Sequence, residues 1–137
     1  MIALIMVATT ISCKKSTTDP PDPPVADKYS VTYKLDMTGD YTDFKLVYYE
    51  TGSVKKEVTS VTFPWEESFD NYVVGDSIVM NFSYMTVLGK PTSYSYSADP
   101  LLNGVTMGVG GAGSATNVNP VPIMKISESV ISYKIVN

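Results

Sequence analysis

The chain has 137 residues, of which 44% are hydrophobic, 18% charged and 11% aromatic, as expected for one globular domain of modest size. It has no histidine, and all of its 10 basic residues are lysines, which excludes histidine-dependent catalytic triads, imidazole zinc sites and bidentate arginine clamps. The net charge of -4 and the scattered lysines argue against nucleic acid as a partner.

An apolar run, residues 1–12, ends at the single cysteine of the chain, Cys13. A helix of this length falls well short of the ~30 Å bilayer core, so the run is typical of a signal peptide and not of a transmembrane anchor. Thr10, Ile11 and Ser12 before the cysteine resemble the lipobox of bacterial lipoproteins, in which this cysteine carries the lipid. We therefore expect a lipoprotein signal peptide over residues 1–12 and lipidation of Cys13; a free thiol is the alternative.

Proline dominates the next segment, residues 14–27, which has no aromatic side chain. Such a composition cannot bury apolar area and predicts a semi-rigid spacer with polyproline character. Residues 13–27 are thus predicted to form a lipidated, proline-rich linker ahead of a folded domain over residues 28–137. An ordinary flexible terminus is the alternative.

From residue 28 onward, apolar residues recur with a period of two, which predicts β-strands. The clearest strand places these side chains on one face: Tyr29, Val31, Tyr33, Leu35 and Met37. The next places Phe44, Leu46 and Tyr48 together, and residues 51–53 turn the chain into a hairpin with residues 54–63.

A change of apolar phase inside residues 54–63 predicts a bulge near residues 59–60. The bulge would bring Val61, Phe63 and Trp65 onto the core-facing side. Trp65 is then predicted to be the central core residue, and stacking on a sugar is the alternative.

Later segments continue the β pattern. Alternation predicts strands over residues 77–84 and around residues 94–96, and two short strands or one bent strand over residues 123–136. Residues 108–119 are rich in glycine, without charge or aromatic side chain, and are predicted to be a mobile loop. No window shows a helical apolar stripe, so we expect an all-β fold: an antiparallel immunoglobulin-like or transthyretin-like β-sandwich of about seven or eight strands.

Two stretches carry a resemblance to a known family. Residues 29–33 (YSVTY) and 55–65 (KKEVTSVTFPW) are similar to the soluble domain of MmpS-like proteins, small β-sandwich proteins with a comparable Pro-Trp pair. This resemblance spans about residues 28–86 and implies an accessory role beside membrane exporters, with the lipobox in place of the family's transmembrane helix. The body of the chain is also similar to Bacteroidetes-type small lipoproteins of unknown function.

Two groups of carboxylates are candidates for chemistry. Asp36, Asp40 and Asp43 could offer oxygen ligands to Ca²⁺, but acidic residues are common in hairpin turns, so we expect no metal site. Glu66, Glu67 and Asp70 could supply the acid and base of a glycosidase, but Glu66 and Glu67 are neighbours on a strand and point to opposite faces. We expect solvated charges, no cofactor and no enzymatic activity.

Tyr49 is the candidate residue for a binding surface. It alternates with the predicted core residues Phe44, Leu46 and Tyr48, so its side chain should be at least partly exposed. An isolated exposed tyrosine is the alternative.

These observations predict a lipid-anchored, non-enzymatic lipoprotein of the bacterial cell envelope. Cys13 would attach it to the outer membrane, on the periplasmic or the surface face. We expect a protein partner in an envelope complex, bound at open strand edges or loops. A glycan-binding module on the cell surface, using exposed tyrosines such as Tyr49, is the alternative function.

Overall fold

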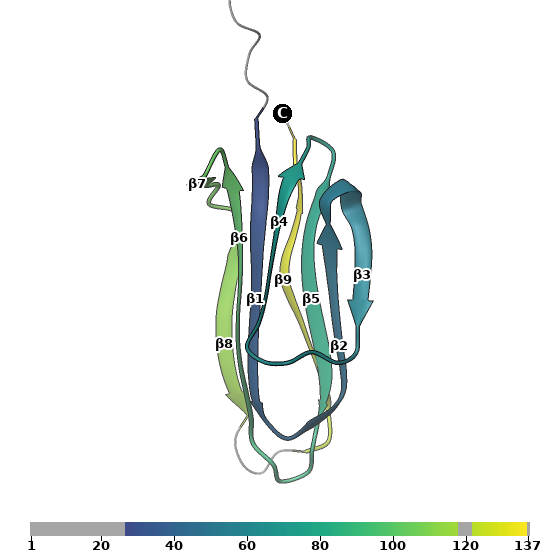
Figure 1. The fold of residues 1–137 in the computed structure, drawn as a ribbon. Coiled ribbons are helices and arrows are strands. Elements are labelled where there is room, and N and C mark those ends of the chain that lie inside the picture. Colours follow the sequence, from purple (N-terminus) through teal and green to yellow (C-terminus); the bar gives the residue numbers. More distant parts are fainter. Residues whose placement is uncertain (1–26, 118–121, 137) are drawn as a thin grey trace, which may run out of the picture.

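The computed structural model describes residues 27–117 and 122–136 (Figure 1). The predicted signal peptide, the lipidation site Cys13 and almost all of the proline-rich linker lie outside the described residues. The described part holds no helix that is long and apolar enough to span a bilayer.

The described chain folds into strands joined by tight turns. In chain order they are β1 (Tyr29–Gly39), β2 (Tyr41–Glu50), β3 (Val54–Val58), β4 (Trp65–Tyr72), β5 (Ser77–Thr86), β6 (Thr92–Leu102), β7 (Val105–Thr106), β8 (Gly111–Asn117) and β9 (Lys125–Lys134). A short 3-10 turn, Thr51–Ser53, joins β2 to β3 and confirms the predicted hairpin.

The strands form two antiparallel sheets that pack face to face (Figure 1). Sheet A has the order β4-β1-β6-β7, and β8 also pairs with β6; sheet B has the order β3-β2-β5-β9. This arrangement confirms the predicted all-β antiparallel sandwich. The described residues form 9 strands, more than the seven or eight expected, because they add the two-residue β7 and the unexpected β8.

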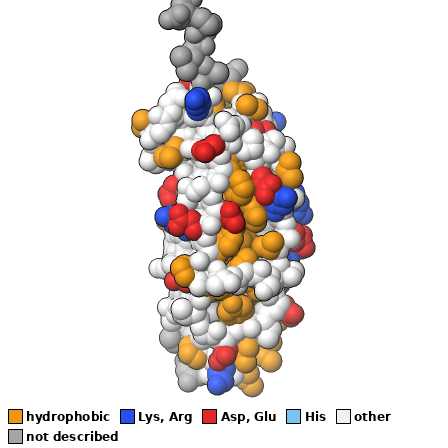
Figure 2. Space-filling view, in the orientation of Figure 1, with side chains coloured by type: hydrophobic (Ala, Val, Ile, Leu, Met, Phe, Trp, Pro, Cys, Tyr) orange, Lys and Arg blue, Asp and Glu red, His pale blue; other side chains and the backbone are white. Residues whose placement is uncertain are grey.

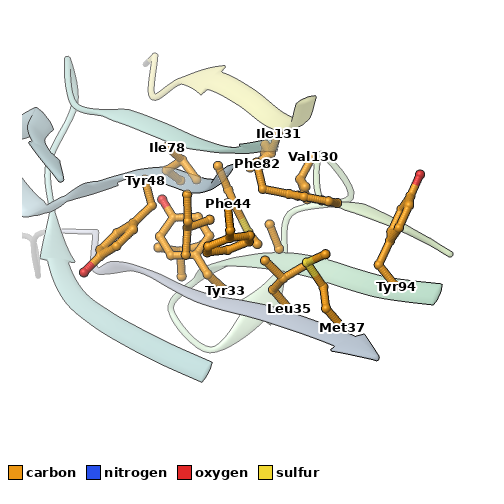
Figure 3. Close-up of a cluster of buried hydrophobic side chains, with 14 of the residues drawn as sticks. Tyr33, Leu35, Met37, Phe44, Tyr48, Ile78, Phe82, Tyr94, Val130 and Ile131 are labelled. Carbon is orange, nitrogen blue, oxygen red and sulfur yellow. The ribbon is translucent and has the colours of Figure 1, made fainter. Parts of the chain in front are cut away.

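The core lies between the sheets and contains the side chains that the period of two predicted (Figure 3). Inward-facing residues of β1, β2, β5 and β6 are buried: Val31, Tyr33, Leu35, Met37, Phe44, Leu46, Tyr48, Ile78, Met80, Phe82, Tyr84 and Tyr94. Each of these strands thus has one apolar face, and burial of these faces between the sheets stabilises their packing.

The buried tyrosines satisfy their hydroxyl groups inside the protein. Tyr33 and Tyr72 both donate to the backbone carbonyl of Tyr49, over 3.0 and 2.7 Å. Tyr94 donates to the carboxylate of Glu128 over 2.6 Å. Because an unpaired buried hydroxyl is costly, these bonds allow tyrosine to occupy a core that would otherwise need phenylalanine.

The mobile loop predicted over residues 108–119 is wrong for residues 111–117, because Gly111–Asn117 forms β8, paired with β6 along its whole length. Residues 118 and 119 lie outside the described residues. Small residues are required here by close packing. A Cβ atom on Gly111 would collide with the backbone oxygen of Val130, and one on Gly113 with the hydroxyl of Tyr96. The sequence of the strand, GAGSATN, has no alternation of large apolar residues, so its pattern did not indicate a strand.

The bulge predicted near residues 59–60 is also wrong. β3 ends at Val58, and the chain then leaves sheet B and crosses to sheet A, where β4 begins at Trp65 (Figure 1). The change of apolar phase therefore reflects a change of sheet. Trp65 is not the central core residue, since it begins an edge strand and its side chain is only partly buried.

The last strand matches the alternative of one bent strand. In β9 the pairing with β5 shifts at Val130, because Ser129 lies opposite Asn81 while Ile131 lies opposite Met80. The extra residue lets the consecutive side chains Val130 and Ile131 both enter the core.

Candidate binding surface

A set of half-buried hydrophobic side chains that pack against the core lies on the side of the sandwich where β4 faces β2 and β3. We call it the aromatic band, and its members are Tyr41, Val58, Val61, Phe63, Trp65 and Phe69. Figure 2 shows hydrophobic side chains gathered along this side of the molecule. Sheet B, the crossing segment and β4 each contribute to it, so the band exists only in the folded domain.

The upper part of the band is built on Tyr48. The Trp65 ring lies 5.2 Å from the Tyr48 ring, centroid to centroid, and the Phe69 ring is stacked on Tyr48 at 5.7 Å. Phe69 also contacts the fully buried Tyr33, with ring centroids 6.1 Å apart. Packing against buried rings holds Trp65 and Phe69 in place while part of each remains open to solvent.

The lower part of the band is built on Phe63, from the segment that crosses between the sheets. Its ring meets Phe44 edge to face at 5.4 Å and Tyr41 at 6.2 Å. Tyr41 in turn meets the buried Tyr84 at 6.2 Å. The band is thus a rigid extension of the core, not a set of loose surface side chains.

Charged residues lie on both sides of the band. On sheet A, Lys34 pairs with Glu66 at 3.4 Å, and on sheet B, Lys45 pairs with Glu57 at 2.7 Å. The hydrogen bond from Lys45 lowers the pKa of the Glu57 carboxyl. Exposed pairs of this kind contribute little to stability, so their main effect is to give the band a polar border.

Carboxylates lie close to Tyr48, at the border of the band. Burial raises the pKa of the Tyr48 hydroxyl, and the nearby carboxylates of Glu50 and Glu67 raise it further. Glu67 lies opposite Tyr33 in register and therefore on the same side of β4 as Trp65 and Phe69. A partner that covers the band would meet these carboxylates at its margin.

A shallow hollow of about 330 Å³ adjoins the band on the outer face of sheet A. Trp65 and Pro64 form one side of it, and Lys34, Asp36 and Glu66 are among its polar lining. The hollow offers a place where a side chain of a partner could sit beside Trp65.

Tyr49 is half-buried on the outer face of sheet B, in register with Lys55 of β3. Among the residues that the structure describes, no other aromatic ring is paired with it, so the structure does not supply a second ring for a sugar platform. Its backbone carbonyl has a role that the sequence did not reveal, because it accepts the hydroxyls of Tyr33 and Tyr72.

A second hollow, of about 440 Å³, lies on the same outer face of sheet B. Lys45, Val47 and Asn81 contribute to its lining, and Tyr49 does not. The side-chain oxygen of Asn81 is buried with no hydrogen-bond partner among the described atoms. Tyr49 and this hollow are therefore separate features.

The carboxylates considered as ligands do not form a site in the described part of the chain. No group of three or more Asp, Glu, His or Cys residues there is close enough to hold a metal ion. Asp40 lies 4.0 Å from Lys90, and Glu66 is paired with Lys34. Glu66 and Glu67 lie on opposite faces of β4, as their adjacency predicted.

Comparison with known proteins adds no relationship: no family model matches the chain, and no curated protein matches it. The resemblance of residues 28–86 to MmpS-like proteins therefore stays a prediction.

Proposed function

We propose that this protein is a non-enzymatic binding module of the bacterial cell envelope, attached to the membrane by a lipid on Cys13, and that its partner is another protein. The aromatic band carries the binding part of the proposal. Tryptophan, tyrosine and phenylalanine are enriched at the centres of protein interfaces, and charged residues are found at their rims. The band has this composition, with the large rings of Trp65, Phe69 and Phe63 in it and Lys-Glu pairs beside it.

The rigidity of the band also supports a protein partner. Its rings are held by buried neighbours such as Tyr33 and Phe44, so little side-chain freedom would be lost on binding. A sugar platform needs a ring whose flat face is open, and Trp65 instead turns part of its ring toward Tyr48. Glycan binding at Tyr49 remains the alternative that the experiments below can distinguish.

Substituting the largest side chain of the band should abolish partner binding. We expect that Trp65→Ser in the full chain will lose a protein that co-purifies with the wild type after detergent extraction, because the largest ring of the interface is removed. Tyr49→Ala, on the outer face of sheet B, should retain it. Urea unfolding of both variants would show that the domain still folds.

The opposite pattern would contradict a protein partner at the band. If the wild type were retained on a polysaccharide column and Tyr49→Ala were not, while Trp65→Ser behaved as the wild type, glycan binding would be the better proposal.

The membrane attachment has its own test. Cys13 is the only thiol of the chain, and it follows an apolar run and precedes a proline-rich segment. We expect Cys13→Ala to abolish incorporation of labelled palmitate and to leave the protein either uncleaved or in the soluble fraction. Equal labelling of the variant and the wild type would rule out lipidation at this residue.

A further inference from the structure

The two sheets expose edge strands, and the edge strands differ in how they are protected from pairing with another chain. β3 and β4 each carry several charges, namely Lys55, Lys56 and Glu57 on β3 and Glu66, Glu67 and Asp70 on β4. β9 is interrupted at Val130, with lysines at both of its ends. Charges and bulges are the usual means by which natural sheets avoid edge-to-edge association.

β8 has neither of these protections. Its sequence, Gly-Ala-Gly-Ser-Ala-Thr-Asn, contains no charged residue and no proline. It pairs with β6 from Thr92↔Asn117 to Ala98↔Gly111 without any shift in register, so the strand is regular. Most of its side chains are exposed and small.

The far edge of β8 has unused hydrogen-bonding groups. In an antiparallel ladder, alternate residues direct their N–H and C=O groups away from the first partner. Within the described residues, no second strand pairs with β8, and no other backbone or side-chain hydrogen bond uses its backbone groups. This edge can therefore accept one more strand.

We propose that β8 pairs antiparallel with β8 of a second copy of this chain, with Ser114 opposite Ser114. A two-fold axis normal to sheet A would pass between the two Ser114 residues and join the two A sheets into one continuous sheet. Ala112 would lie opposite Thr116, and Gly113 opposite Ala115.

The absence of charge on β8 argues for a second copy as the occupant. The edge strand β4 is poorly suited to pairing with β4 of a second copy. All of its charges are negative, so such a pair would bring acidic side chains close to one another. β8 has no charges to oppose one another, although the whole chain carries a net charge of -4.

The pair should be weak in dilute solution. One strand edge buries less surface than the about 1,600 Å² of a standard protein interface. Confinement of both copies to a membrane would raise their effective concentration and favour the dimer. Only this last effect depends on the lipid anchor proposed above; the pairing itself does not.

Disulfide cross-linking of the full chain in intact cells tests the pairing and its register. Opposed Cα atoms in an antiparallel pair are about 4.5 or 5.5 Å apart, within the range that a disulfide can span. After mild oxidation, Ser114→Cys should give several-fold more disulfide-linked dimer than Ser127→Cys, a control whose side chain is also exposed, on β9. The wild type shows the background from Cys13. Ala112→Cys and Thr116→Cys should cross-link when co-expressed, and neither should do so alone.

Ser114→Lys provides a second, independent variant. It would place two lysines opposite each other, so concentration-dependent dimerisation of the purified full chain, measured by sedimentation, should be lost, while Ser127→Lys should retain it. The proposal would be overturned if Ser114→Cys formed no more disulfide-linked dimer than Ser127→Cys. It would also be overturned if Ser114→Lys dimerised as strongly as the wild type. A Ser114→Cys adduct whose mass identifies a different protein would overturn it as well.

Discussion

Leu46→Ala should lower the free energy of unfolding of a chain comprising residues 27–137 by about 2–5 kcal/mol, whereas Val47→Ala should lower it by about 1 kcal/mol or less. Leu46 is 0% exposed and lies between the sheets, so its removal leaves a closed cavity. Val47 is the next residue of β2, but its side chain is half-buried on the outer face. Urea unfolding monitored by tryptophan fluorescence would measure both effects.

The comparison tests the layered arrangement directly. A domain of this size has a total stability of only about 5–15 kcal/mol, so the expected loss at Leu46 is a large share of it. Equal effects of the two substitutions would mean that β2 is not buried on one face only. Trp65→Ala should lower the free energy of unfolding less than Leu46→Ala does, because the Trp65 ring is only partly buried.

The sequence predicted the inward faces of the long strands well, because burial along a strand follows a local pattern of period two. Val31, Tyr33 and Leu35 are examples: each is at most 1% exposed. The same pattern could not show which strands become neighbours. β1 pairs with β6, from Tyr29↔Leu102 to Gly39↔Thr92. Such pairing joins segments that are far apart in the sequence, so a local pattern does not reveal it.

The candidate surface was harder to predict for the same reason. Phe69 and Tyr41 belong to different sheets, and only the crossing of the chain between Val58 and Trp65 places them on one side of the sandwich. β8 escaped prediction because glycine and alanine carry no hydrophobic signal. The small size of its residues matches the close approach of Tyr96 and Val130, which belong to other strands. A local sequence pattern cannot show such an approach.

The stability of the domain should be constant from about pH 6 to 8 and should fall steeply above about pH 10. The chain has no histidine, which is the side chain that ordinarily titrates near neutrality. At higher pH the buried tyrosines become important. Burial raises the pKa of Tyr33 to about 12 and raises that of Tyr72 well above its usual value, with the neighbouring Tyr33 hydroxyl adding to the effect.

The direction of the effect follows from proton binding. The folded state holds the hydroxyl protons of Tyr33 and Tyr72 more tightly than the unfolded state, where tyrosine has a pKa of about 10. The stabilisation is therefore complete below pH 10 and is lost as the pH rises toward the folded-state values. Each of these two groups can remove up to about 1.4 kcal/mol per pH unit in that window.

Urea midpoints measured from pH 6 to 12 on residues 27–137 would test this dependence. Tyr72→Phe removes one of the two hydroxyls that donate to the Tyr49 carbonyl, so its stability should fall less steeply above pH 10, even if it starts lower at pH 7. Tyr49→Phe is the matched control, because its ring lies on the outer face of sheet B and its backbone carbonyl is unchanged. Tyr72→Phe could instead lose stability as steeply as the wild type above pH 10. The hydroxyl of Tyr72 would then ionise as freely in the folded domain as in the unfolded chain. In that case the buried tyrosine pair could not be the source of alkaline unfolding.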